Sequence, residues 1–290
     1  MGKILITGAT GQLGRLVVKH LLDSGITAQN VVAMVRNEEK AAELIKLGLE
    51  IRMGNYDHSD TLRAAFQDID KLLFISSSSP DGSHRIIQHA SVAKAARDAG
   101  VGHVVYTSLG FADKVALGIE NVHLATEFAV KETHIPYTIL RNAFYIDTLL
   151  DPFIPDAVAS GVIVSAAKGS KMNFAARNDF ALAAAKVLTT DGHQNKVYEL
   201  SNPNPYSFDE FAAIISEVSH KEVKHIELTP EQAKEHMLKQ GVSEGWAGFY
   251  TQMWKAFELG YFSLASNDLI NLIGNKLTSV KEEVQKVLNG

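Results

Sequence analysis

Short apolar runs alternate with longer amphipathic stretches through the first 140 residues of the chain. The apolar runs predict six strands, at Ile4–Thr7, Val31–Val35, Leu49–Met53, Lys71–Ser76, His103–Thr107 and Tyr137–Leu140. Apolar residues at helical spacing follow the first run, and such spacing recurs at Glu38–Leu47, Thr61–Phe66, Arg85–Ala99 and Val122–Thr133. Strands that alternate with helices in this way form right-handed crossovers. The pattern therefore predicts an α/β fold, a Rossmann-type doubly wound parallel sheet with helices on both faces.

The alternation ends after about Asp151, where proline and glycine separate shorter pieces of strand and helix. We therefore predict a Rossmann core over residues 1–150. Residues 151–290 are predicted to return to this core and to end in a smaller, mixed, largely helical lobe for a substrate. The helical region Thr229–Leu288 carries Trp246, Phe249, Tyr250, Trp254, Phe257, Tyr261 and Phe262. These rings are either the core of that lobe or the wall of an apolar pocket.

Composition and charge exclude several classes of function. With 28 Lys and Arg against 33 Asp and Glu, the formal net charge is -5, and no basic run favours nucleic acid as a partner. The chain has no cysteine, which excludes disulfides, thiolate chemistry and cysteine-bound metals, and no metal site is predicted. No apolar segment has the length of a signal peptide or a membrane span. We expect a cytoplasmic protein.

A glycine-rich turn lies between the first predicted strand and the first predicted helix. Its Gly-x-x-Gly-x-x-Gly spacing is typical of dinucleotide-binding turns, in which glycines permit a sharp turn, a close approach to a pyrophosphate and tight helix packing. The start of the helix then offers free amide donors to the phosphates. The predicted cofactor-binding residues of this turn are Thr7, Gly8, Ala9, Thr10, Gly11, Gln12, Leu13 and Gly14.

The residue after the second strand distinguishes NADP from NAD. A carboxylate at that position binds the ribose hydroxyls and repels a 2′-phosphate. Here the first residue past Val31–Val35 is Arg36, a planar cation suited to a phosphate. The sequence therefore predicts NADP(H) as cofactor. The alternative is a solvated Arg36, or one that forms a salt bridge to Glu38 or Glu39.

These motifs, together with Gly54–Asp57 and Leu140–Tyr145, resemble the NmrA-like group of atypical short-chain dehydrogenase/reductases. Within it, the chain is most similar to the type-2 NAD(P)H:quinone oxidoreductases and the triphenylmethane reductases. The resemblance extends over essentially the whole chain. It implies that the loop after the fourth strand borders the cofactor ribose and phosphates, and that the residues after the sixth strand lie beside the nicotinamide. The cofactor-binding residues that it adds are Ser76, Ser77, Ser78, Asn142, Ala143 and Phe144.

The chain departs from ordinary short-chain dehydrogenases in the helix after the fifth strand. Those enzymes carry a Tyr-x-x-x-Lys pair there, in which the lysine lowers the tyrosine pKa for proton transfer. This chain reads His123-Leu124-Ala125-Thr126-Glu127, so that a tyrosinate relay is excluded. The catalytic candidates are His123 as a proton donor, and Asn142 and Tyr145 as donors to the acceptor or the carboxamide. For each of the three, a purely structural hydrogen bond is the alternative.

Reduction of an electrophilic aromatic acceptor does not need a tyrosine–lysine pair, because a stacked quinone or cationic dye accepts hydride directly. The resemblance thus implies an NADPH-dependent oxidoreductase for a quinone-like or dye-like acceptor. The alternative is an NmrA-like redox sensor that binds NADP(H) without turnover. A sugar-nucleotide epimerase is disfavoured, since that chemistry needs the missing tyrosine. The oligomeric state is not defined by the sequence, and a homodimer stays open.

Overall fold

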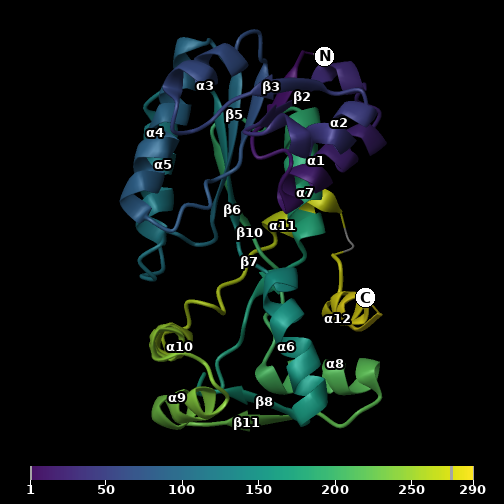
Figure 1. Ribbon diagram of the computed structural model, residues 1–290, viewed down its shortest axis with the longest axis vertical. Helices are drawn as coiled ribbons and strands as arrows, with labels where there is room; N and C mark the ends of the chain where they lie inside the picture. The colour runs from purple at the N-terminus through teal and green to yellow at the C-terminus, as the bar shows by residue number, and fades with distance from the viewer. Residues whose placement is uncertain (1, 275–276, 290) are drawn as a thin grey trace.

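A seven-stranded parallel sheet forms the centre of the upper part of the molecule (Figure 1). The computed structural model describes residues 2–274 and 277–289, without the side chains of residues 148–153. The strand order is β3-β2-β1-β4-β5-β6-β10, and it reverses direction between β1 and β4, as in doubly wound sheets. The strands are β1 Ile4–Ile6, β2 Val31–Val35, β3 Glu50–Met53, β4 Lys71–Phe74, β5 His103–Leu109, β6 Tyr137–Asn142 and β10 Lys196–Leu200. The predicted α/β fold is confirmed.

Helices cover both faces of this sheet (Figure 1). Successive strand residues point to opposite faces, so that Leu72 belongs to one apolar cluster and Leu73 to the other. The Leu73 side is covered by α1 Gln12–Asp23, α2 Ala42–Lys46, α7 Arg177–Thr189 and α11 Asp268–Ile273. The Leu72 side is covered by α3 Ser59–Ala65, α4 Gly82–Asp98 and α5 Glu120–Lys131. Burial on both faces explains why the strands read as continuous apolar runs.

The predicted element boundaries differ from the observed ones in ways that have local causes. The fourth strand ends at Phe74 rather than at Ser76, because the amide of Ile75 donates to the Thr7 hydroxyl (2.9 Å) instead of a strand partner. The sixth strand continues to Asn142 through its pairing with β5 and β10. The helix predicted at Glu38–Leu47 is divided into a 3-10 turn, η2 Glu38–Ala41, and α2; a second such turn, η1, spans Ala28–Asn30.

A second group of elements lies below the sheet in Figure 1 and packs around a third apolar cluster. It contains two small parallel strand pairs, β7 Phe144–Tyr145 with β9 Phe174–Ala175, and β8 Val162–Ser165 with β11 Lys224–Glu227. Its helices are α6 Ile146–Ser160, α8 Phe208–Ser219, α9 Pro230–Lys239, α10 Glu244–Glu258 and α12 Val280–Asn289. Between α6 and α8 the chain returns to the sheet as α7 and β10. The division into residues 1–150 and 151–290 stays a prediction.

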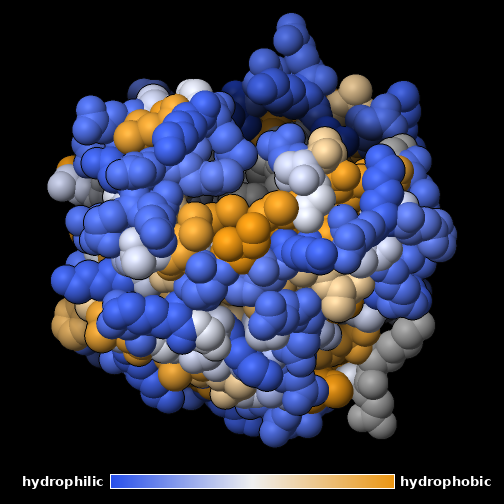
Figure 2. Space-filling view, turned by 90° about the horizontal axis from the view of Figure 1, so that it is seen from below, coloured by the Kyte–Doolittle hydropathy of each residue, from blue (hydrophilic) through white to orange (hydrophobic). Residues whose placement is uncertain are grey.

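The aromatic residues of the lobe divide into a buried and an exposed set. Phe257 and Phe262 are core residues, only 3% and 5% exposed, and their rings stack 4.2 Å apart. Trp246 and Phe249 are 60% and 53% exposed and contact each other on the surface of α10. Phe257 and Phe262 are therefore core residues of the lobe as predicted, whereas Trp246 and Phe249 are not. Seen from the lobe, apolar side chains gather near the centre of a largely hydrophilic face (Figure 2).

No helix within residues 2–274 and 277–289 is long and apolar enough to cross a membrane.

Candidate functional site

The glycine-rich turn joins β1 to α1 and has the geometry that its spacing predicts. Gly8 has a φ of +59°, a left-handed conformation that favours glycine. A Cβ on Gly14 would lie 2.4 Å from the carbonyl oxygen of Gly8, so only glycine permits this contact between helix and turn. Gly11 is the N-cap of α1, and no side chain in the described part of the chain caps that end. The first amides of α1 are therefore available to an anion.

Three residues of the turn have their side chains in the core. Ala9 and Leu13 are buried, and Thr7 is fully enclosed. The Thr7 hydroxyl donates to the carbonyl of Leu73 (3.2 Å) and lies 2.6 Å from the Tyr56 hydroxyl. Thr7 thus joins β1 to β4, and the three residues can present only their backbone to a ligand. Gly8, Gly11 and Gln12 are exposed, and Thr10 is partly buried.

Arg36 is exposed directly after β2, the strand that pairs with β1. Among the described residues it forms no salt bridge, so the predicted alternative of an ion pair with Glu38 or Glu39 is not present. The amide of Glu39 instead donates to the side chain of Asn37 (2.8 Å), which caps η2. The guanidinium is therefore free to bind a phosphate beside the glycine turn.

The serine loop after β4 is held by α4 and β5. The Ser76 amide donates to the Thr107 hydroxyl (3.1 Å), and the Ser77 amide donates to Nε2 of His89 (2.8 Å). The Ser77 hydroxyl donates to Gln88 (2.5 Å). Ser78 is exposed, and its hydroxyl has no partner within the described ranges. These bonds fix the loop over the carboxyl ends of β4 and β5, the edge at which doubly wound sheets bind ligands.

His123 and His89 are buried neutral groups beneath that loop. Nδ1 of His123 lies 2.9 Å from the Tyr106 hydroxyl, and burial lowers the pKa of His123 to about 4. His89 accepts from Ser77 through Nε2, so its proton is on Nδ1, which donates to Thr126 (2.7 Å). Burial lowers the pKa of His89 to about 3. The contact of His123 is the structural hydrogen bond weighed as an alternative above, and its catalytic role stays a prediction.

Asn142 and Tyr145 meet at the end of β6. Nδ2 of Asn142 donates to the Tyr145 hydroxyl (3.1 Å), while Oδ1 is buried without a partner among the described residues. An unpaired buried oxygen of this kind costs about 1–3 kcal/mol. The Tyr145 ring packs 5.2 Å from Phe180, and the Arg177 guanidinium lies 5.1 Å from its centre. Burial raises the pKa of Tyr145, so the phenol keeps its proton.

The two residues between them are held by the backbone and by the lobe. The Ala143 amide donates to the carbonyl of Leu200 (2.8 Å), which extends the pairing with β10 past the end of β6. Phe144 packs its ring against Phe262, with centroids 4.9 Å apart. Phe144 therefore lies where the sheet meets the apolar cluster of the lobe.

Glu127 of α5 belongs to a buried ion-pair cluster. Both of its oxygens accept from Arg141, from Nε at 2.8 Å and from a terminal nitrogen at 2.9 Å. The same guanidinium donates to Glu199 (2.8 Å) and pairs with Asp113 (2.9 Å). Ser108 donates to Glu127 as well (2.7 Å). Glu127 therefore links α5 directly to β5 and β6, and Arg141 extends the cluster to β10.

Arg141 and Glu199 were not singled out from the sequence. Each is a charged residue inside an apolar strand, and the two stand opposite each other in the pairing of β6 with β10. Opposite charges in two such strands were the available signal, since a buried charge requires a partner.

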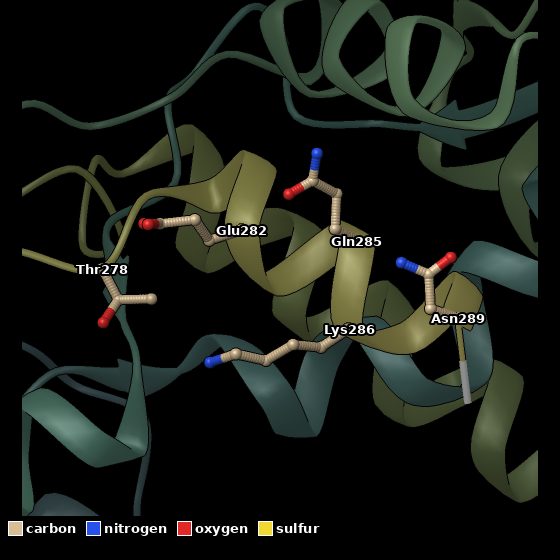
Figure 3. Close-up of a pocket in the computed structure, with 5 residues that line it drawn as sticks. All are labelled: Thr278, Glu282, Gln285, Lys286 and Asn289. Atoms are coloured by element: carbon tan, nitrogen blue, oxygen red, sulfur yellow. The ribbon is translucent and has the colours of Figure 1, made fainter.

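Two surface depressions lie away from these residues. One lies along α12 and is lined by Thr278, just before the helix, and by Glu282, Gln285, Lys286 and Asn289, which project from α12 in Figure 3. The other lies between α1 and α2, beside Leu22 and Leu47. Neither contains a predicted site residue.

The NmrA-like family model matches residues 1–280. The chain belongs to the NmrA-like family. The resemblance predicted from the glycine turn, Arg36 and the end of the sixth strand is thereby confirmed.

Individual proteins match this chain over nearly their full length. Quinone oxidoreductase 2 of Escherichia coli is 36% identical over 286 residues, 99% of each protein. The structure of Citrobacter sp. triphenylmethane reductase complexed with NADP(H) has a TM-score of 0.92 and 45% identity, and the match covers 98% of this chain and 100% of that one. An NADPH-dependent quinone oxidoreductase from Escherichia coli, complexed with NADPH, has a TM-score of 0.90 and 36% identity, over 99% and 100% of the two chains.

The ion-pair cluster predicts a structural role for Glu127 of the NmrA-like chain. Glu127→Gln should lower the free energy of unfolding by about 1–3 kcal/mol, because Arg141 loses one charged partner and keeps two. Urea titration measures this loss. Glu132→Gln, which removes an exposed carboxylate directly after the same helix, is the matched control and should be nearly neutral. Equal stability of the two variants would contradict the structural assignment.

The buried histidines predict a loss of stability in acid. The pKa of His123 is about 4 in the folded protein and near 6.5 when unfolded, so between these values the unfolded chain binds the extra proton. Stability should therefore fall as the pH drops from 6.5 to 4. His123→Gln should reduce the slope by up to about 1.4 kcal/mol per pH unit. The exposed His58 provides the control, as His58→Gln; an unchanged slope in His123→Gln would show that His123 titrates normally.

Proposed function

We propose that the chain is an NADPH-dependent oxidoreductase that delivers hydride to a quinone-like or dye-like aromatic acceptor. The observation that carries this proposal is the Asn142–Tyr145 pair at the carboxyl end of β6, with one buried amide oxygen left without a partner. Family membership and two relatives whose structures contain NADP(H) or NADPH support the choice of cofactor.

The residues present fit the cofactor in two respects. Gly8 has a left-handed φ of +59°, and Gly14 leaves no room for a Cβ beside the carbonyl oxygen of Gly8. The turn presents the uncapped amides of α1 to a pyrophosphate. Oδ1 of Asn142 would accept a hydrogen bond from the carboxamide of the nicotinamide, which removes the free-energy cost of the unpaired oxygen. Arg36 would bind the 2′-phosphate, and the loop from Ser76 to Ser78 would border the ribose. When bound, NADPH supplies the hydride.

The other residues of this proposal orient the acceptor and control protons. The Tyr145 hydroxyl remains protonated, because burial raises its pKa, and it donates to an acceptor oxygen as negative charge develops there. His123 has a pKa of about 4 and stays neutral at pH 7, so it carries no proton to give as an imidazolium. The proton that completes the product comes from solvent. This limits the enzyme to acceptors that take hydride without simultaneous proton transfer.

A turnover test separates the reductase from a sensor that only binds NADP(H). We expect NADPH oxidation by the pure protein with benzoquinone, naphthoquinone or a cationic dye to exceed the rate in buffer clearly, while simple ketones are not reduced. Tyr145→Phe keeps the ring between Phe180 and Arg177 and removes only the hydroxyl. It should lower kcat with naphthoquinone by about tenfold or more, because the lost donor acts on the developing charge, while the NADPH Kd stays within about twofold.

Tyr198→Phe is the matched control, because it removes a tyrosine hydroxyl that binds His193 (2.9 Å) away from the site. It should leave both constants unchanged. If the protein binds NADPH tightly but accelerates its oxidation with none of the acceptors, the reductase proposal fails and the sensor interpretation takes its place.

Arg36 determines the preference between cofactors in this proposal. Arg36→Ala should weaken NADPH binding by about 1–3 kcal/mol, the range for removing one partner of a charged hydrogen bond. NADH binding should barely change, since NADH lacks the phosphate. Fluorescence titration with both cofactors measures this, and Arg63→Ala removes an exposed arginine elsewhere as a control. Equal losses for NADPH and NADH would disprove the assignment.

A further inference from the structure

Arg85 is a cation without an anionic partner at the edge of the serine loop. It lies in the first turn of α4, and its guanidinium donates to the Ser76 hydroxyl (3.2 Å). Its Nε is buried and unpartnered among the described residues, and no carboxylate in residues 2–274 and 277–289 pairs with it. The side chain is partly buried, so this charge is removed from much of the surrounding water without compensation. Such a charge is costly unless something supplies the missing interaction.

The groups packed around Arg85 are uncharged. The pKa of His89 is lowered to about 3 and that of His123 to about 4, first by burial and then by the positive charge of Arg85. Burial raises the pKa of Tyr106, which keeps its phenol proton. Arg141, by contrast, is bound by three carboxylates. The buried Arg141 therefore links elements of the fold through ion pairs, whereas the partly buried Arg85 has no such partner among the described residues.

The Arg85 guanidinium lies near the edge of the sheet that is formed by the carboxyl ends of the strands. Ser76 follows β4 and is bonded to Thr107 of β5, so the guanidinium lies at the carboxyl ends of these two strands. This is the edge at which doubly wound sheets bind ligands. The positive charge of Arg85 also acts on His123 and helps to lower the pKa of that imidazole.

We propose that Arg85 determines acceptor specificity, by favouring neutral and anionic quinones over cationic dyes. This inference rests on the proposed reductase function and narrows its substrate class. A neutral quinone that takes hydride from NADPH becomes a hydroquinone monoanion, NADPH becomes NADP+, and one proton from solvent completes the hydroquinone. The guanidinium stabilises the oxyanion before that proton arrives. A cationic acceptor instead meets a like charge in a site of low dielectric, which opposes its binding.

The test compares acceptors of different charge. For Arg85→Gln we expect kcat/KM to fall about tenfold with anionic naphthoquinone sulfonate, to fall less with neutral naphthoquinone, and to rise severalfold with the cationic dye crystal violet. Arg85→Lys keeps the charge and should retain most of the wild-type order of preference. Arg63→Gln, which removes an exposed arginine of α3, should change none of the three values. The NADPH Kd should stay within about threefold in every variant.

Several outcomes would overturn the proposal. If Arg85→Gln lowers all three kcat/KM values by one factor and weakens NADPH binding, Arg85 binds the cofactor and not the acceptor. If crystal violet and naphthoquinone sulfonate respond alike, charge selection is absent.

Failure of the proposed function gives a different result. In that case the wild-type protein reduces none of the acceptors, and equilibrium binding decides the role of Arg85 without turnover. Naphthoquinone sulfonate is then titrated into the complex with NADP+. A Kd raised about tenfold in Arg85→Gln and unchanged in Arg63→Gln would support the anion site. An equal Kd in the two variants would refute it.

Discussion

The structure at the carboxyl ends of the strands depends on the ion pairs of the Arg141 guanidinium. This guanidinium binds Glu127 of α5 through two hydrogen bonds and Glu199 of β10 through a third, with Asp113 as a further partner. A buried cation is tolerated only when its donors are satisfied in this way. Because Asn142 is the next residue in β6, the same cluster fixes where its amide stands. Glu127 therefore has a structural role, because it binds both Arg141 and Ser108.

Polar groups at the carboxyl ends of the strands fall into two classes. Thr7, Ser77 and His89 are bonded to other parts of the protein and give the edge its shape. Arg36, the amide oxygen of Asn142 and Nε of Arg85 lack protein partners within the described part of the chain. The two buried groups of this class, Oδ1 of Asn142 and Nε of Arg85, carry a free-energy cost while they are unpaired and are expected where a ligand completes the bonding, whereas the exposed Arg36 is solvated. These three groups lie along one edge of the sheet, from Arg36 beside the glycine turn to Asn142 at the end of β6.

The sequence predicts local features of this protein better than its long-range contacts. Runs of apolar residues reveal the strands because both faces of the sheet are buried. The glycine spacing reveals the turn because the positive φ of Gly8 favours glycine and a Cβ on Gly14 would clash with the carbonyl oxygen of Gly8. The pairing of Arg141 with Glu199 depends on strand register and was not foreseen. Nε of Arg85 is buried without a partner because of how α4 packs against the serine loop, and residue spacing in the sequence does not predict this packing. The motif in the helix after the fifth strand identifies His123 as a candidate, but it does not predict that the His123 side chain is buried.

In the proposed reaction, NADPH bound at the carboxyl ends of the strands passes hydride to an aromatic acceptor beside Asn142 and Tyr145. Stopped-flow absorbance of the NADPH-loaded protein mixed with naphthoquinone tests this most directly, in a single turnover. We expect stoichiometric loss of NADPH, at a rate that falls severalfold when the transferred hydrogen is deuterium. Loss of NADPH no faster than in buffer would contradict hydride transfer by this protein. So would a fast phase whose rate stays the same when either of the two hydrogens at the reacting carbon of NADPH is replaced by deuterium.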